Sequence, residues 1–348
     1  MSAATAPVPT APAPRLRRSD PAVPGIARHR HGRGFRYVDE EGRRVTDEAV
    51  LRRIEELVIP PAWRDVWICP YPGGHIQATG VDERGRTQYL YHPRWRARRD
   101  QQKFADMVRF AAALPALRES VEADLARDDF SREHVLACAT RLLDRGFFRI
   151  GSEDYAVTNA SYGLATMRKE HVRLDGERIR FDYPAKSGKR RVHGVVDPEV
   201  ARVVARLKAR RSGGEELLAY RQARRWCDIR SPDINDYLKQ ASGLDVSAKD
   251  FRTWGATVLA AVALAVTDPA VTTKTARQRA ILRAVREVAH YLGNTPAVAR
   301  ASYIDPRVFD RYRDGQTIRG ALGEIAADAE ATAIQGPAER AVLELLGA

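Results

Sequence analysis

The stretch VRLDGERIRFDYPAKSGKRRVHGVV, residues 172–196, decides the fold class of this 348-residue chain. Asp175-Gly176 and Lys186-Ser187-Gly188 are turn signals, and the segments around them are rich in Val, Ile, Phe and Tyr. Segments of this kind separated by two turns predict a three-stranded antiparallel sheet. Helical patterns dominate on both sides, so we expect a mostly helical domain that contains this one sheet.

Helix start and stop signals organise the rest of that domain. Asp197 followed by Pro198 predicts a helix with proline in its first turn. Ser247 and Asp250 form a capping-box pattern that opens the most apolar helix of the chain. A long helical pattern ends at Gly293, and the last residues of the chain predict two further helices.

The N-terminal part has a different pattern, with short strand-like segments and one helix between Thr46 and Pro60. The predicted strands cover residues 35–39, 66–70, 75–80 and 87–92. A basic run predicts a linker near Arg96 to Gln102. We therefore expect an α+β protein with a disordered Pro/Ala-rich tail (1–22), a β-rich N-terminal domain (23–99) and a larger, mostly helical C-terminal domain (100–348).

The charge of the chain indicates the class of partner. Lys and Arg number 58 against 45 Asp and Glu, which gives a formal charge of +13 and an isoelectric point near 9.9. A basic protein of this kind favours a polyanion, and nucleic acid is the leading candidate. A membrane span is not expected, because the longest apolar run, residues 255–266, is shorter than the roughly 20 residues required.

Sequence signals for a metal or a nucleotide cofactor are missing. The three cysteines, at 69, 138 and 227, form no C-x-x-C pair and fit a reducing, cytosolic setting. The chain has no G-x-x-x-x-G-K-[ST] loop, and no cluster of carboxylates suited to two metal ions stands out. We expect no metal and no cofactor.

Five positions in the helical half are candidates for chemistry: Arg149, Lys186, Arg252, Asn294 and Tyr303. Taken singly, each has a plain structural explanation, since most Arg and Lys residues of a basic chain are solvated and most tyrosines pack in a core or at its rim. Their settings are unusual. Arg149 follows two phenylalanines, Lys186 lies at a hairpin tip, and Arg252 lies in the first turn of the most apolar helix, where burying a cation is unfavourable unless an anion compensates it.

Four strings that contain these residues occur in order: RGFFRIGSEDYA, FDYPAKSG, SAKDFRTWGAT and LGNTPAVARASYIDP. They resemble the signature of type IB DNA topoisomerases, in particular the compact poxvirus-like bacterial group. Two N-terminal strings, IPPAWRDVWICP and GHIQATGVDERGRTQYLYHPRW, resemble the N-terminal domain of that group. The resemblance extends from Val23 to about Tyr312 and implies the catalytic fold shared by tyrosine recombinases and type IB topoisomerases.

The resemblance implies relaxation of positive and negative supercoils by transient cleavage of one strand, strand swivelling and religation, without ATP or an obligatory metal. Tyr303 would be the nucleophile that forms a 3′-phosphotyrosyl bond. Arg149 and Arg252 would stabilise the transition state, and Lys186 would be the general acid. Asn294 stands where most of the wider family has histidine, so it would donate a hydrogen bond to phosphate but could not transfer a proton.

The resemblance also implies DNA contacts by Tyr155, Gln88, Tyr89 and Tyr91, for which packing in the β core is the alternative interpretation. The strand pattern places Gln88 on one face and the two neighbouring tyrosines on the other. The expected partner is duplex DNA, clamped by a monomer in the cytoplasm, in association with the nucleoid.

Two other functions are compatible with parts of the pattern. A tyrosine recombinase uses a similar set of residues, but its second arginine usually lies in H-x-x-R, whereas this chain has Lys249-Asp-Phe-Arg252. A catalytically inactive DNA-binding protein is the other alternative, and the retention of all but one catalytic residue type disfavours it.

Overall fold

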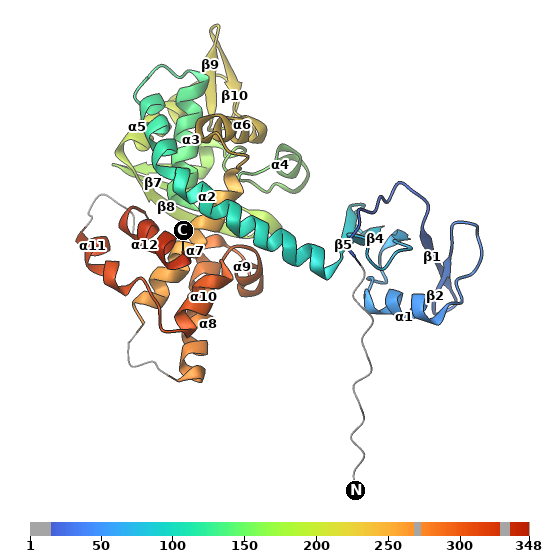
Figure 1. The fold of residues 1–348 in the computed structure, drawn as a ribbon. Coiled ribbons are helices and arrows are strands. Elements are labelled where there is room, and N and C mark those ends of the chain that lie inside the picture. The colour runs from blue at the N-terminus through green and yellow to red at the C-terminus, as the bar shows by residue number, and fades with distance from the viewer. Residues whose placement is uncertain (1–14, 268–272, 328–334, 348) are drawn as a thin grey trace. The chain divides into compact units, whose positions relative to one another are not determined.

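The computed structural model describes residues 15–267, 273–327 and 335–347; the side chains of Tyr155 and Ser187 lie outside this description. The chain divides into two compact units, residues 1–103 and 104–348. Each unit has its own hydrophobic core. The first is built around an antiparallel sheet and the second is mostly helical, so the predicted α+β class is confirmed (Figure 1).

The N-terminal unit contains a five-stranded antiparallel sheet in the order β2-β1-β3-β4-β5. Its strands are β1 (Ile26–His31), β2 (Gly34–Val38), β3 (Arg64–Ile68), β4 (Ile76–Val81) and β5 (Thr87–Tyr91). Helix α1 (Glu48–Glu56) contributes Ile54 to the core of this sheet. The helix begins one residue later than predicted, because Asp47 rather than Thr46 accepts the backbone hydrogen bonds of the first turn.

Strand β1 was not predicted, because its sequence IARHRH reads as charged. The structure gives one of these charges a structural role. The Arg28 guanidinium donates to the carbonyls of Ile59, Pro60 and Trp63 at 2.8 to 3.3 Å. It also lies 4.2 Å from the centre of the Phe35 ring. The pattern of apolar residues along the sequence does not reveal contacts of this kind, so it did not predict the strand.

The predicted N-terminal tail is too long. Its first fourteen residues lie outside the described part of the chain, but Arg17 and Ser19 are bonded to the N-terminal unit. The Arg17 amide donates to the Gly73 carbonyl at 2.8 Å, and the Ser19 hydroxyl donates to the Ile76 carbonyl at 2.9 Å. These contacts use backbone groups far away in sequence, which local composition cannot indicate.

The predicted linker at residues 96–102 lies inside a helix, α2 (Pro93–Leu125). The sequence after Pro93 is rich in Arg, Gln, Lys and Ala, which are good helix formers, and contains no glycine. The basic, polar composition of residues 96–102 is therefore that of an exposed helix, although we predicted an irregular linker there.

The second unit, residues 104–348, carries the remaining elements. Its helices are α3 (Arg132–Gly146), α4 (Glu153–Asn159), α5 (Pro198–Ala209), α6 (Ser231–Ser242), α7 (Ala248–Ala265), α8 (Lys274–Leu292), α9 (Pro296–Ser302), α10 (Pro306–Arg313), α11 (Leu322–Ala327) and α12 (Pro337–Leu346). Its strands are β6 (Val172–Asp175), β7 (Arg178–Pro184), β8 (Arg190–Val196), β9 (Ala219–Gln222) and β10 (Arg225–Asp228).

The three-stranded sheet predicted for residues 172–196 is confirmed, with strand order β6-β7-β8 and antiparallel pairing throughout. Alternate residues of β7, Ile179, Phe181 and Tyr183, are buried in the core of the unit. The pairing register places Tyr183 opposite Arg191. The short turn at Lys186–Gly188 connects β7 to β8, so the sheet brings these two residues and Lys186 to one end.

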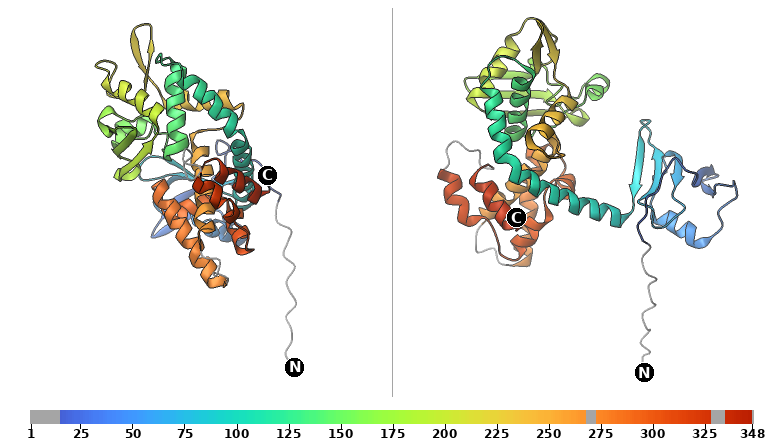
Figure 2. Two further views of the ribbon diagram at one scale, coloured as in Figure 1. Left: turned by 90° about the vertical axis from the view of Figure 1, so that its left-hand side faces the viewer. Right: turned by 45° about the horizontal axis from the view of Figure 1, so that its top comes forward.

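The β9-β10 hairpin was not predicted. It projects from the second unit in each view (Figures 1 and 2). Its turn residues, Ala223 and Arg224, have φ values of 45° and 71°, a left-handed conformation that hairpin turns usually assign to Asn or Gly. Without those turn residues the sequence gives no hairpin signal.

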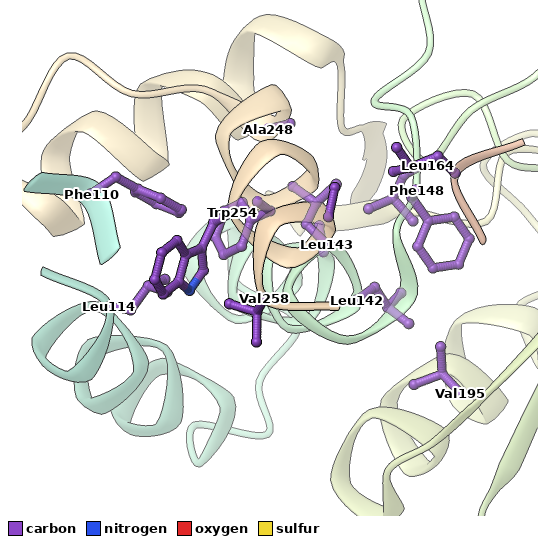
Figure 3. Close-up of a cluster of buried hydrophobic side chains, with 14 of the residues drawn as sticks. Phe110, Leu114, Leu142, Leu143, Phe148, Leu164, Val195, Ala248, Trp254 and Val258 are labelled. Carbon is purple, nitrogen blue, oxygen red and sulfur yellow. The ribbon is translucent and has the colours of Figure 1, made fainter. Parts of the chain in front are cut away.

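Helix α7 is the central element of the core in the second unit. Figure 3 shows its residues Trp254 and Val258 among buried side chains from α2 and α3, including Leu114 and Leu143. The predicted capping box is present, since the Asp250 carboxylate accepts from the Ser247 amide at 2.8 Å. A helix packed on several sides is a rigid support for the residues it carries, one of which is Arg252.

Candidate active site

Arg149 lies in the short connection after α3, where neighbouring residues hold the backbone in place. Helix α3 ends at Gly146, its C-cap residue Phe147 has the left-handed φ of 52°, and Phe148 is fully buried against Phe181. The Arg149 carbonyl accepts a hydrogen bond of 2.8 Å from the Leu164 amide. The predicted anchoring of Arg149 by its apolar neighbours therefore has a structural basis, supplemented by this backbone hydrogen bond.

Arg252 is the fifth residue of α7 and is only 3% exposed. Its guanidinium donates to the Phe147 carbonyl and, at 3.0 Å, to the Leu292 carbonyl. Burial, followed by the nearby charge of Arg149, lowers the pKa of Arg252 to about 10. The Nε atom of Arg252 is buried and has no hydrogen-bond partner among the described residues.

The C-terminus of α8 holds three arginines through three successive carbonyl groups. Arg191 donates to Tyr291 O at 2.5 Å, Arg252 to Leu292 O at 3.0 Å and Arg149 to Gly293 O at 2.8 Å. Helix C-terminal carbonyls lack intrahelical partners and carry a partial charge of roughly −0.5. In the part of the chain that the structure describes, none of these guanidiniums is paired with a carboxylate. We call Arg149, Arg191 and Arg252 the arginine cluster.

Gly293 permits this close approach. Its φ of +61° lies in the left-handed region, and a Cβ atom at this position would lie 2.7 Å from Nη1 of Arg191 and 3.6 Å from Nη1 of Arg149. A side chain here would shift the Arg191 guanidinium, whereas the distance to Arg149 is an ordinary van der Waals contact. Glycine is favoured at this position by its left-handed φ at the helix end and by the space that the Arg191 guanidinium occupies.

Asn294 follows directly and is bound to the same cluster. Its backbone amide donates to the Ala289 carbonyl at 3.0 Å, and its side-chain oxygen accepts a hydrogen bond from Arg149. Its amide nitrogen is buried and completes no hydrogen bond of good geometry within the described residues. The site thus contains a fixed neutral donor beside the guanidiniums.

Tyr303 is half-buried at the end of α9, and its backbone carbonyl accepts a hydrogen bond of 3.3 Å from the Thr257 hydroxyl on α7. The centre of its ring lies 5.3 Å from the Arg252 guanidinium carbon and 6.0 Å from Lys249 Nζ. Burial by itself would raise the pKa of the Tyr303 phenol. The charge and hydrogen bond of Arg252 and the charge of Lys249 oppose burial and lower the pKa below its ordinary value of 10.

Lys186 lies in the exposed turn between β7 and β8 and faces a cavity of about 490 Å³. Arg149, Arg191 and Asn294 also line this cavity. The lysine reaches the other predicted residues through this shared space and not through a direct bond.

The phenol of Tyr183 also lies close to the arginine cluster, and the charges of the cluster influence the pKa of this phenol. It is only 2% exposed, and burial raises its pKa despite the charges of Arg191, Arg149 and Arg252. The pKa values of the two phenols are therefore shifted in opposite directions, downward for Tyr303 and upward for Tyr183.

Helix α12 supports α7 from behind through a buried carboxylate. Glu339 accepts from Trp254 Nε1 at 2.8 Å and from Arg118 at 2.6 and 3.0 Å. Arg118 also binds Asp144 of α3 at 2.9 and 3.0 Å. Since Trp254 lies two residues after Arg252, this network fixes the helix turn that carries the buried arginine.

The structure thus brings all five predicted catalytic residues into one region of the second unit, where their roles remain predictions. Arg149, Arg252 and Asn294 meet at the end of α8, Tyr303 lies beside Arg252, and Lys186 shares the cavity. Sequence reasoning missed Arg191 and Lys249. The place of Arg191 in β8, opposite the buried Tyr183, was the available signal, but one arginine in a basic run did not stand out.

The predicted DNA-binding residues of the N-terminal unit lie on β5. Tyr89 and Tyr91 are 46% and 40% exposed, and their rings stack with centres 6.1 Å apart. Gln88 points to the other face and donates to Asp82 at 2.9 Å, so it is not part of the exposed tyrosine pair. The backbone of Tyr155 lies in α4, and its side chain is outside the described part of the structure.

Within residues 15–267, 273–327 and 335–347, no three His, Cys, Asp or Glu side chains gather in a way that suits a metal ion. Across the same ranges, every helix is too short or too polar to cross a lipid bilayer. The described site brings together arginines, a lysine, an amide and phenols.

Comparisons with known proteins identify the family of this chain. The family described as eukaryotic DNA topoisomerase I, catalytic core, matches residues 92–321, and the family described as bacterial DNA topoisomerase IB, N-terminal domain, matches residues 34–82. The DNA topoisomerase 1B of Acanthamoeba polyphaga mimivirus is 27% identical over 304 residues, which cover 83% of this chain and 88% of the relative.

Two poxvirus proteins are more distant relatives. The DNA topoisomerase I of monkeypox virus is 21% identical and the DNA topoisomerase 1B of vaccinia virus (strain Copenhagen) is 20% identical, each over 237 residues, 68% of this chain and 72% of the relative. The family match to the catalytic core extends over more than half of the chain and contains all five predicted catalytic residues. The chain therefore belongs to the type IB DNA topoisomerases, a family of isomerases.

Proposed function

We propose that this enzyme relaxes positive and negative supercoils by cutting one DNA strand through a 3′-phosphotyrosyl intermediate and resealing it. The observation that carries the proposal is the phenol of Tyr303, whose pKa is lowered beside a cluster of three arginines that has no carboxylate partner within the described residues. Such a site suits an anion that is attacked by a phenolate.

The reaction follows from the groups present. The Tyr303 oxygen attacks the phosphorus, the bond from phosphorus to the 5′-oxygen breaks, and Lys186 donates a proton to that oxygen. Guanidiniums are permanently charged planar donors, which suits Arg149 and Arg252 to the non-bridging oxygens of the transition state. The unpaired amide nitrogen of Asn294 adds a neutral donor. Fixed donors of this kind contribute about 3 kcal/mol each to transition-state stabilisation.

Resealing reverses these steps. The phosphotyrosyl ester replaces one phosphodiester bond by another, so the free 5′-hydroxyl can attack it without an external energy source. Between the two steps the free end rotates about the intact strand, driven by the torsion in the DNA. ATP is therefore not required, and the transition-state charge is balanced by protein cations.

DNA binding is proposed for the exposed pair Tyr89 and Tyr91, and for Gln88 and Tyr155 by resemblance to the family. Phosphate contacts of a chain with a charge of +13 make binding fall steeply as salt increases. We propose a monomer that clamps duplex DNA in the cytoplasm, at the nucleoid. The assignment of residues 23–99 to clamping and 100–348 to catalysis is part of the same proposal.

The test is relaxation of a supercoiled plasmid in EDTA without nucleotide. Wild-type protein should relax plasmids of both supercoil signs, Tyr303→Phe should bind DNA without relaxing it, and Tyr183→Phe should retain activity because its buried phenol is not ionised. An inactive DNA-binding protein would leave the supercoils unchanged. A recombinase-like strand transferase would join strands between two duplexes, and such products would replace the proposal of relaxation.

A further inference from the structure

Arg191 is a third guanidinium in the site, outside the five residues considered so far. It lies in β8, three residues after the turn that carries Lys186, and donates to Tyr291 O at the end of α8. A Cβ atom on Gly293 would lie 2.7 Å from its Nη1 atom, on the side where Arg149 also approaches. Arg191 thus lies beside Arg149 across the same glycine.

The charge of the cluster favours an anion. Three guanidiniums share one helix C-terminus, whose partial charge of roughly −0.5 offsets only a fraction of theirs. Among the described residues no carboxylate is paired with Arg191, in contrast to its neighbour Arg190, which binds Asp182 with both contacts at 2.6 Å. The side chain of Arg191 interacts with the neutral Tyr183 phenol, and no carboxylate among the described residues balances its charge as Asp182 balances that of Arg190.

The position of Arg191 indicates the cavity in which such an anion would bind. It lines the cavity of about 490 Å³ together with Lys186, Arg149 and Asn294, while Tyr303 does not line this cavity. The cavity is therefore on the side of Lys186, the proposed donor to the leaving 5′-oxygen. A phosphate held by Arg149 and Asn294 would meet Arg191 on that side.

We propose that Arg191 binds a non-bridging oxygen of the scissile phosphate and is a further catalytic residue of this enzyme. The inference rests on the proposed function. In the free enzyme the Tyr291 carbonyl holds the guanidinium in place, so the donor is oriented before DNA arrives. Such preorganisation is the condition under which a fixed cation accelerates a reaction most.

The experiment compares Arg191→Gln with Arg180→Gln, which removes the same charge from an exposed position on the neighbouring strand. The substrate is a duplex with a mapped cleavage site and only a few base pairs beyond that site. After cleavage the short released fragment dissociates and cannot be religated, so each enzyme molecule cleaves once. We expect Arg191→Gln to cleave roughly 100-fold more slowly than wild type, and Arg180→Gln to stay within about twofold. Arg191→Lys, which keeps the charge but loses the planar fork, should recover part of the loss.

A second substrate separates phosphate binding from a structural role. A methylphosphonate at the cleavage position replaces one charged oxygen by a methyl group. If Arg191 acts on that charge, the ratio of wild-type to Arg191→Gln rates falls toward one on this substrate. A ratio that stays near its value on ordinary DNA would show that Arg191 only ties β8 to α8, and would overturn the inference.

The controls also separate this inference from the proposed function. If wild-type protein forms no covalent product with DNA, the proposed function itself fails. If wild-type protein cleaves and Arg191→Gln, with an unchanged circular dichroism spectrum, cleaves equally fast, only the role of Arg191 is refuted.

Discussion

His193 gives a quantitative test of how the site treats charge. Its ring packs against Phe148 and Phe181, with ring centres 4.5 and 5.5 Å away, and neither ring nitrogen has a partner in the described residues. Burial, followed by the charges of Arg191 and Arg252, lowers its pKa from 6.5 to about 3. The imidazole is therefore neutral in the folded protein at pH values well above 3.

The pH dependence of stability follows from this difference. Below pH 6.5 the unfolded chain binds a proton at His193 and the folded chain does not, so stability falls as pH falls through the window from 6.5 to 3. At pH 4.5 the two-unit distance from 6.5 corresponds to about 3 kcal/mol. Burial also lowers the pKa of His134 and of His171, so wild-type protein loses further stability in the same direction.

The comparison of His193→Phe with wild type isolates this contribution. Urea denaturation of the full chain, measured at pH 7 and pH 4.5 by fluorescence and circular dichroism, should show a smaller loss for the variant by about 3 kcal/mol. His290→Gln, which removes an exposed histidine from the same unit, should behave as wild type. Equal losses for wild type and His193→Phe would refute the account of a neutral histidine beside the arginine cluster.

Three further predictions concern the support and the chemistry of the site. Glu339→Ala should lower the free energy of unfolding by about 3 kcal/mol, because it breaks a buried ion pair, whereas Glu344→Ala on the exposed side of the same helix should change it by less than about 0.5 kcal/mol in urea denaturation. Arg252→Gln removes the main group that lowers the Tyr303 pKa. The single-turnover cleavage rate should therefore fall by about 100-fold, and the pH at which this rate rises should move upward. An unchanged pH profile would contradict the interaction between Arg252 and Tyr303. Asn294→His should remain active and Asn294→Ala should lose rate, and a histidine variant as slow as the alanine variant would refute the hydrogen-bonding role.

The sequence predicted those parts of the fold that have local signals. Turn residues at Asp175-Gly176 and Lys186–Gly188 were sufficient for the β6-β7-β8 sheet, and the Ser247 cap was sufficient for the start of α7. The β9-β10 hairpin lacked such signals because Ala223 and Arg224 occupy left-handed positions. Both residues are exposed at the hairpin tip, and neither is a residue type that marks such a turn in a sequence.

The predicted site residues depended on motifs matched to a family, and the structure adds the reason for their arrangement. The carbonyl groups of Tyr291, Leu292 and Gly293 each bind one arginine, and this pattern follows only from the packing of α8 against β8 and α7. A basic chain of 58 Lys and Arg residues gives no means of selecting Arg191 without that geometry. Residue types were thus predictable, and the third guanidinium was not.

The identity of the covalently attached atom tests the central claim most directly. Wild-type protein is incubated with the shortened duplex, denatured and digested, and the peptide that carries DNA is analysed by mass spectrometry. The account predicts a nucleotide joined through its 3′-phosphate to Tyr303, together with a free 5′-hydroxyl on the released strand. Attachment through Tyr183 or another residue, or through a 5′-phosphate, would contradict it.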